Sequence, residues 1–203
     1  MERRTRAIVL GVLALCALVP RHASAQPAEP LPPIVQPAGE EAYHALMQFL
    51  DYDRGQPLDA RVVATEEIAG QAREKIAFNG PGSERVPGYL AFPKDQARPC
   101  PLVLELHGLT ESKEVWWQEQ EHFRGGLVTQ GLLRSGIAVL ALDAPNHGER
   151  THSNDYRLPW GILADGKFQR WRRMLVDGVV EYRVAMDYLA TRVDVDTCVP
   201  SWT

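Results

Sequence analysis

Two nearly continuous apolar runs, Leu102–Leu106 and Ile137–Leu142, dominate the hydrophobic pattern, and each ends in a polar turn that contains a His-Gly pair. Runs of this kind are typical of strands in a parallel sheet that is buried on both faces. Between them, Trp117–Arg134 has a helical pattern that Gly125-Gly126 interrupts. The order strand, helix, strand predicts a β-α-β unit and an α/β fold class with a mostly parallel sheet and flanking helices.

Shorter segments precede this unit. Lys75–Phe78 and Tyr89–Phe92 predict two strands, and the turn-forming residues of Asn79–Gly82 between them predict an antiparallel hairpin. Further upstream, Gly39–Leu50 has apolar residues at helical spacing and predicts a short amphipathic helix. The mixed segment Asp51–Gly70 is interpreted as a surface wrap over the sheet.

The longest periodic pattern follows the second apolar run. It predicts an amphipathic helix over Lys167–Thr191 whose apolar stripe packs on the core. The residues of this stripe recur at steps of three and four: Trp171, Leu175, Val179, Tyr182, Met186 and Leu189. The polar segment Thr151–Gly166, interrupted by Gly and Pro, predicts a loop or small cap above the sheet.

The first 25 residues have the pattern of a secretory signal peptide. A positively charged start is followed by the apolar run Ala7–Val19 and by the small-residue cleavage site Ala23-Ser24-Ala25. The run is shorter than the about 20 apolar residues that span a bilayer. A lipoprotein anchored through Cys16 and an uncleaved membrane anchor are the alternatives.

We therefore expect three segments: a signal peptide over residues 1–25, a Pro-rich leader with an N-terminal helical extension over residues 26–72, and a folded domain over residues 73–203. The mature protein would be secreted or periplasmic, without a stable membrane anchor after cleavage. Cleavage removes four arginines and one glutamate, so the net charge moves from −4 to −7. An acidic protein has no electrostatic reason to bind nucleic acid or an anionic membrane.

The turns after the two apolar runs carry the candidate chemistry, because reactive groups in such sheets lie where the strands end. His107, Gly108, Leu109 and Thr110 follow the first run, and Asp143–Arg150 follows the second. Backbone N–H groups just past a strand can be directed at the oxyanion of acyl transfer, and Gly108 allows a tight turn. Ordinary strand-to-helix turns are the simpler alternative.

Taken together, the His-Gly-Leu-Thr turn and the Asp-Ala-Pro-Asn-His-Gly-Glu-Arg turn resemble the α/β-hydrolase fold in its esterase, dienelactone-hydrolase and prolyl-oligopeptidase branch. The resemblance covers about Arg73–Asp196. It implies an oxyanion loop at residues 107–110, with the N–H of Leu109 as donor and that of Thr110 next. His107 would be a structural residue of the turn rather than the catalytic base.

The resemblance also implies a structural turn at Asp143, His147, Gly148 and Arg150. Asp143 would accept hydrogen bonds from nearby backbone N–H groups, while His147 and Arg150 would brace the loop that lines the pocket. These are scaffold roles rather than catalytic ones.

Two cysteines, Cys100 and Cys198, remain after signal cleavage. Export would place them in an oxidising compartment. Each lies where a strand should begin, and in the resembled fold those two strands are neighbours. They form either a disulfide or two unrelated thiols, and sequence spacing does not decide between these.

The nucleophile of the resembled family is the Ser of a G-x-S-x-G turn after the next strand, and this motif does not occur in the chain. Val193–Asp196 resembles the approach to that strand, and the residues after it depart from the pattern. We therefore expect a partial α/β-hydrolase fold, the N-terminal half of the domain, truncated before the nucleophile strand. In the resembled strand order, 1-2-4-3-5, Leu102–Leu106 would then form an exposed sheet edge.

The function implied by the resemblance is that of a serine hydrolase lineage acting on small-molecule carboxylic esters. The chain would be inactive as a fragment because it lacks the Ser, acid and His triad. A non-catalytic binding module of the same fold and a peptidase-like hydrolase are the alternatives. A metal site at His147 and His152, with Asp143 and Asp155 nearby, is disfavoured because none of the common zinc spacings occurs. No metal or other cofactor is expected.

Overall fold

The computed structural model describes residues 39–68, 70–94, 98–120 and 124–196. The chain divides into two units, residues 1–41 and 42–203, and the account below concerns the second. The expected signal peptide and most of the Pro-rich leader lie outside the described residues, and so does Cys198.

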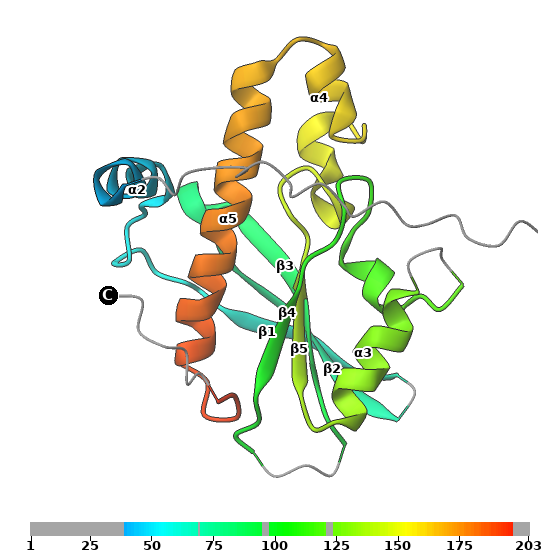
Figure 1. Cartoon of the computed structure of the whole chain (residues 1–203). Coiled ribbons are helices and arrows are strands. Elements are labelled where there is room, and N and C mark those ends of the chain that lie inside the picture. Colours follow the sequence, from blue (N-terminus) through cyan, green and yellow to red (C-terminus); the bar gives the residue numbers. More distant parts are fainter. Residues whose placement is uncertain (1–38, 69, 95–97, 121–123, 197–203) are drawn as a thin grey trace, which may run out of the picture. The chain divides into compact units, whose positions relative to one another are not determined.

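A five-stranded sheet in the order β1-β2-β3-β5-β4 forms the centre of this unit (Figure 1). Its strands are β1 Arg61–Ile68, β2 Gln71–Asn79, β3 Arg85–Phe92, β4 Leu102–Glu105 and β5 Ala138–Leu142. The neighbouring pairs β1–β2, β2–β3 and β3–β5 are antiparallel, and β4 pairs parallel with β5. The α/β fold class is confirmed, and the sheet of the described residues is mixed rather than mostly parallel.

β1 corrects the interpretation of residues 51–70 as a surface wrap. Arg61–Ile68 forms the outer strand of the sheet, beyond β2. Nearly all of its residues are exposed, so neither face carries the apolar alternation that identifies a half-buried strand. The predicted hairpin of β2 and β3 is confirmed, with the turn at Gly80–Glu84.

Four α-helices and several short 3₁₀ segments complete the described part of the chain. The α-helices are α2 Glu40–Met47, α3 Gly125–Arg134, α4 Trp160–Ala164 and α5 Phe168–Ala190, and the 3₁₀ segments are η2 Gln48–Leu50, η3 Pro81–Ser83, η4 Lys113–Trp117 and η5 Gly148–Asn154. No helix of the described residues is both long enough and apolar enough to cross a membrane.

The helix expected over Trp117–Arg134 is split. Its first part is the 3₁₀ segment η4, and α3 begins only at Gly125. A Cβ atom at Gly125 would lie 2.4 Å from the carbonyl oxygen of Val115, so the backbone of η4 passes directly against the start of α3. The glycine that interrupts the helical pattern therefore permits this close contact.

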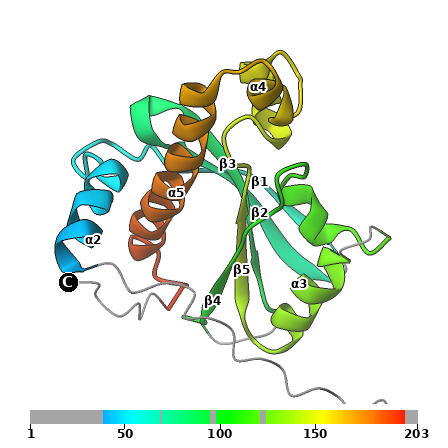
Figure 2. The ribbon, with the colours of Figure 1, turned by 45° about the horizontal axis from the view of Figure 1, so that its top comes forward.

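Both faces of the central strands are covered, α5 lying on one side and α3 with η4 on the other (Figures 1 and 2). Successive residues of β5 point to opposite faces of the sheet. Ala138, Leu140 and Leu142 pack in the core on the α5 side, and Val139 and Ala141 pack against α3 and η4 on the other side. This explains why β5 is apolar throughout.

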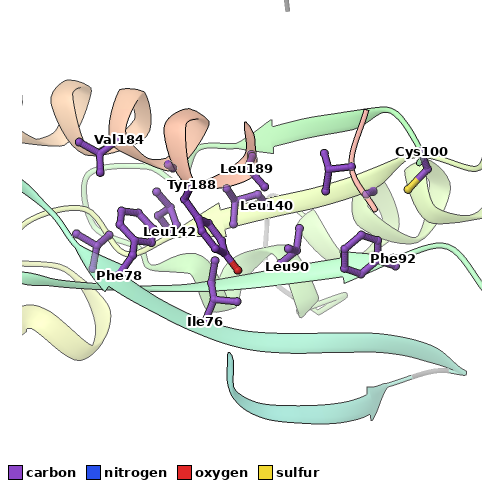
Figure 3. Close-up of a cluster of buried hydrophobic side chains, with 14 of the residues drawn as sticks. Ile76, Phe78, Leu90, Phe92, Cys100, Leu140, Leu142, Val184, Tyr188 and Leu189 are labelled. Carbon is purple, nitrogen blue, oxygen red and sulfur yellow. The ribbon is translucent and has the colours of Figure 1, made fainter. Parts of the chain in front are cut away.

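The larger core lies between α5 and the sheet (Figure 3). Tyr188 of α5 stacks on Phe78 of β2 with ring centroids 5.9 Å apart, and Leu189 is fully buried beside them. Burial of each such side chain contributes roughly 1.5–3 kcal/mol.

The predicted apolar stripe of α5 is only partly its core face. Leu189 is buried, and Tyr182 and Met186 are partly buried. By contrast, Leu175 and Val179 are about half exposed. The face of α5 that packs in the core is instead formed by Val180, Val184, Ala185, Tyr188 and Leu189.

β4 is the edge strand of the described sheet. Its free side carries a single parallel bridge, in which Cys100 N–H donates to Asp194 O at 3.3 Å and Asp196 N–H donates to Cys100 O at 2.8 Å. The chain after α5 therefore returns to this side of the sheet and pairs with Cys100, two residues before β4 begins.

Candidate functional site

The two polar turns meet at one edge of the sheet, because β4 and β5 run parallel and end side by side, with Glu105 paired to Ala141. The ring centroids of His107 and His147, one from each turn, lie 4.8 Å apart. The backbone N–H of Ala144 donates to Nε2 of His107 at 3.1 Å. The two turns of the predicted site therefore meet where β4 and β5 end, as the sequence predicts.

His107 acts in this structure as a fixed part of its turn. Since its Nε2 accepts a hydrogen bond, its proton lies on Nδ1, which donates to the Gly108 carbonyl at 2.8 Å. Burial lowers the pKa of His107 below 6.5, so the ring is neutral at pH 7. Both ring nitrogens are engaged within the protein, which leaves neither one to act as a base.

His147 fastens the first turn to the second. Its Nε2 lies 2.8 Å from the carbonyl oxygen of Leu109, and its Nδ1 lies 2.9 Å from that of Pro145. The carbonyl of Leu109 is thereby held toward the second turn. No acceptor within the described part of the chain pairs with the backbone N–H of Leu109 or Thr110.

Asp143 is the buried centre of the second turn, with no exposed surface. Its carboxylate accepts hydrogen bonds from the backbone N–H groups of Lys113 and Glu149, each at 3.0 Å, and from Nζ of Lys113 at 2.7 Å. Burial by itself would lower the pKa of Lys113, but Asp143 and Glu149 raise it overall. The ion pair therefore links η4 to the end of β5.

Arg150 connects the second turn to α5. Its guanidinium forms a two-pronged ion pair with Glu181, at 2.6 and 2.8 Å, and both side chains are buried. The same group donates to the Asp143 carbonyl at 3.2 Å and to Glu84 at 2.9 Å. Two-pronged Arg–carboxylate pairs fix orientation as well as position, so this contact sets the turn against the helix.

Two cavities flank His147. The first, of about 520 Å³, lies between residues of β4 and α5 and is lined mostly by apolar side chains, and its lining includes His107, Gly108 and Leu109. The second, of about 370 Å³, is more polar. Its polar lining includes Thr110, Glu111, Ser112, Gln118, Asn146 and Thr151.

Three further charged residues of this region, Glu105, Lys113 and Glu181, are buried. Glu105 lies under α3, where the hydroxyl of Thr129 donates to its carboxylate, and burial raises the pKa of Glu105 from 4.5 to about 7. Lys113 and Glu181 pair with Asp143 and Arg150. Two features of the sequence could have indicated such buried acids: Glu105 lies inside an apolar run, and Glu181 lies next to the apolar stripe of a predicted helix.

The histidines of the disfavoured metal alternative, His147 and His152, lie against backbone carbonyls. Nδ1 of His152 lies 3.1 Å from the carbonyl of Glu149. Within residues 39–196, apart from the undescribed gaps, no group of three or more His, Cys, Asp or Glu side chains could hold a metal ion. The pairing of Cys100 with Cys198 stays a prediction, because Cys198 lies outside the described residues.

Known proteins match the chain in structure only. No family model and no curated protein matches the sequence. A Bacteroides fragilis structure assigned as an acetyl xylan esterase matches with a TM-score of 0.58 at 14% identity, over 75% of this chain and 42% of its own. A glucuronoyl esterase from Solibacter usitatus matches with a TM-score of 0.49 at 16% identity, over 72% of this chain and 45% of its own.

An acetyl xylan esterase from Paenibacillus sp. R4 matches with a TM-score of 0.48 at 15% identity, over 77% of this chain and 48% of its own. These neighbours are α/β-hydrolase esterases. The chain has a partial α/β-hydrolase fold. It spans less than half the length of each of these neighbours, and the first of them carries the assignment. At such identities the likeness shows the fold. The described strands β2, β3, β5 and β4 match the first four positions, 1-2-4-3, of the expected order, with β1 as an additional outer strand.

Proposed function

We propose that the chain derives from an esterase-type serine hydrolase acting on carboxylic esters, and that residues 107–110 form its oxyanion loop. The observation that carries this proposal is the orientation of one turn. His147 binds the Leu109 carbonyl oxygen and holds it toward the second turn. The N–H groups of Leu109 and Thr110 have no acceptor among the described residues. Such N–H groups stabilise the oxyanion of acyl transfer, and loss of one typically costs about 10²–10³ in rate.

The apolar cavity beside Leu109 supports the same proposal. An ester places its carbonyl at the oxyanion donors and its apolar part in an adjoining pocket, and Leu106, Met174 and Val179 line such a pocket here. The fold that the chain shares with a structure assigned as an acetyl xylan esterase also supports this chemistry, at the level of the fold alone.

The oxyanion role can be tested with methylphosphonate, a small tetrahedral anion. In an ¹⁵N-labelled sample, we expect the amide signals of Leu109 and Thr110 to shift most on titration, with the exposed turn at Gly82 as internal control. In a His147→Phe variant, whose ring cannot hold the Leu109 carbonyl, these shifts should fall severalfold. Equal shifts in both proteins, or the largest shifts elsewhere, would contradict the proposal.

We further propose that this chain has no triad-based turnover. In support, no serine Oγ of the described residues is hydrogen-bonded to a histidine, since Ser112 accepts from Glu114 N–H and Ser153 donates to Arg150 O or Asn146 Oδ1. We expect p-nitrophenyl acetate hydrolysis at background rate and no labelling by a fluorophosphonate. A serine peptide carrying the label would refute this, and Ser112→Ala with Ser153→Ala would identify its source.

A non-catalytic binding module is the second candidate, favoured by the apolar cavity itself. For this function, an apolar fluorescent probe should bind with no effect of methylphosphonate. Gly178→Leu, which would fill the cavity from α5, should abolish that binding, whereas Gly131→Ala on α3 should not.

A further inference from the structure

We propose that the tip of the hairpin formed by α4 and the first turns of α5, residues 155–177, binds the surface of an anionic lipid bilayer. The two helices extend together beyond the ends of the strands (Figures 1 and 2). Trp160 of α4 stacks on Trp171 of α5, with ring centroids 5.7 Å apart. The carboxylate of Asp165 pairs with both Arg157 and Lys167, at 2.9 and 3.0 Å, which brings the segment before α4 next to the start of α5.

Large apolar side chains are exposed at this tip. They are Tyr156, Leu158, Trp160 and Phe168, whose exposed fractions lie between 49% and 81%. Tyr156 and Leu158 flank Arg157, and Phe168 follows Lys167, so the ion pairs to Asp165 hold these apolar groups near one another. Exposed apolar groups that gather in one region indicate an interaction surface.

The same tip carries an excess of positive charge. Residues 155–177 contain five cations and three acids, a net charge of +2 on a chain whose net charge is −4. The side chains of Asp165 and Asp177 are only 32% exposed, whereas those of Arg157, Lys167 and Arg173 are 50–81% exposed. The positive charges therefore reach further into solvent than the acids that pair with them.

This combination matches the interface of a membrane. Trp and Tyr rings are favoured at the level of the lipid headgroups, and Lys and Arg are attracted by anionic lipids. The acidic net charge of the whole chain does not oppose such contact, because charges more than a Debye length away, about 8 Å at physiological salt, are largely screened. The expectation from net charge alone therefore does not apply to this tip.

Two other occupants fit the tip less well. A symmetric contact with a second copy would place the same cations opposite one another, and such like-charge contacts are costly. A nucleic acid would stack its bases on open aromatic faces, but Trp160 and Trp171 each cover a face of the other.

The orientation of the bound protein can be tested with a fluorescent dye at either end of α5. The full chain with Cys16→Ser and Cys198→Ser keeps only the buried Cys100, and the dye is attached through Ala164→Cys at the tip. The matched control is Ala190→Cys, also exposed, at the far end of α5. Because α5 has 23 residues and is roughly 34 Å long, that end should stay away from the headgroups.

The probe is a vesicle of equal parts phosphatidylcholine and phosphatidylglycerol that carries a nitroxide-labelled headgroup. We expect quenching of the dye at position 164 to exceed that at position 190 severalfold. Vesicles of phosphatidylcholine alone should give little quenching at either position, and high salt should reduce the quenching by anionic vesicles.

Surface variants test whether the tip itself supplies the affinity, measured by quenching at position 164. Lys167→Gln and Arg173→Gln should each lower the apparent affinity for anionic vesicles about fivefold, the effect expected for one cation near the membrane surface. Arg61→Gln, at an equally exposed arginine of β1, should leave it unchanged. Phe168→Ser should weaken binding, and its control Val193→Ser, at a more exposed apolar residue, should not.

Several outcomes would overturn the proposal. Equal quenching at both dye positions, or equal quenching by neutral vesicles, would mean that the tip is not the part that recognises the anionic surface. A response at position 164 that rises with protein concentration without vesicles would identify a second copy as the occupant. A response there to single-stranded DNA but not to vesicles would identify a nucleic acid instead.

Discussion

Gly148 illustrates how a single residue shapes the second turn. Its backbone has φ of +50°, and a Cβ atom there would lie 2.2 Å from Oδ1 of Asp143. The turn folds so closely around the Asp143 carboxylate that no side chain fits. The sequence marked Gly148 as part of a His-Gly turn, but only the structure identifies Asp143 as the group it approaches.

Gly148→Ala should therefore destabilise the protein by about 2 kcal/mol or more, through backbone strain and displacement of the Asp143 carboxylate. The control Gly131→Ala lies in α3 with nothing within 4 Å of its Cβ, and should stabilise by up to about 1 kcal/mol. Urea unfolding of both variants measures the difference. An unchanged midpoint for Gly148→Ala would show that the turn relaxes freely.

Glu105 gives a prediction of pH dependence. Burial raises its pKa in the folded state to about 7, above the value of 4.5 for an exposed glutamate. The associated stability is therefore complete below pH 4.5 and is lost as the pH rises through 7. Each pKa unit corresponds to about 1.4 kcal/mol, so the loss by pH 8 is on the order of 3 kcal/mol at most.

Glu105→Gln should flatten this profile, so that unfolding free energies measured at pH 5 and pH 8 differ less than in the parent. Glu119→Gln, at an exposed glutamate, serves as the control and should leave the profile unchanged. If the parent were equally stable at both pH values, the buried carboxylate would not titrate in this range.

At the scale of elements, hydrophobic patterning predicted the hairpin, β4, β5 and α5 within a few residues of their observed bounds. It failed for β1, an outer strand that buries almost nothing, and for the start of α3, where backbone contact with η4 decides the boundary. Patterning reports burial, so elements set by exposed pairing or by backbone contact escape it.

The pair of Arg150 and Glu181 ties α5 to the second turn. Removal of one partner leaves the other charge buried, so Arg150→Met should cost roughly 3–5 kcal/mol in unfolding free energy. The double variant with Glu181→Met should recover most of this loss. Arg61→Met, which breaks an exposed pair with Asp59, should cost less than about 1 kcal/mol.

Urea unfolding of the four proteins gives the coupling energy of the buried pair. If the double variant were as unstable as Arg150→Met alone, the loss would come from packing of the arginine side chain rather than from an unpaired carboxylate.

At the scale of the folded unit, residues 42–196, we expect the edge at β4 to control any association between molecules. An apolar sheet edge is a template for pairing between molecules, and a charge placed on it opposes that pairing. Leu106, at the end of this edge, is 60% exposed, while Val193 is 92% exposed and lies off the edge.

Leu106→Lys should lower concentration-dependent light scattering relative to the parent while changing the thermal midpoint by only a few degrees. Val193→Lys adds the same charge and should have a much smaller effect. Equal reductions for the two variants would mean that net charge, rather than the edge of β4, controls association.

The sequence by itself determined the β-α-β unit, the hairpin and the meeting of the His107 and His147 turns, because apolar runs, helical periodicity and turn-forming residues are local features of the chain. Only the tertiary structure decided which groups those turns bind: Lys113 under Asp143, Glu181 on Arg150, and His147 on the Leu109 carbonyl. These partners lie 30 to 38 residues apart in the chain. Such contacts depend on how strands and helices pack, which no local pattern specifies.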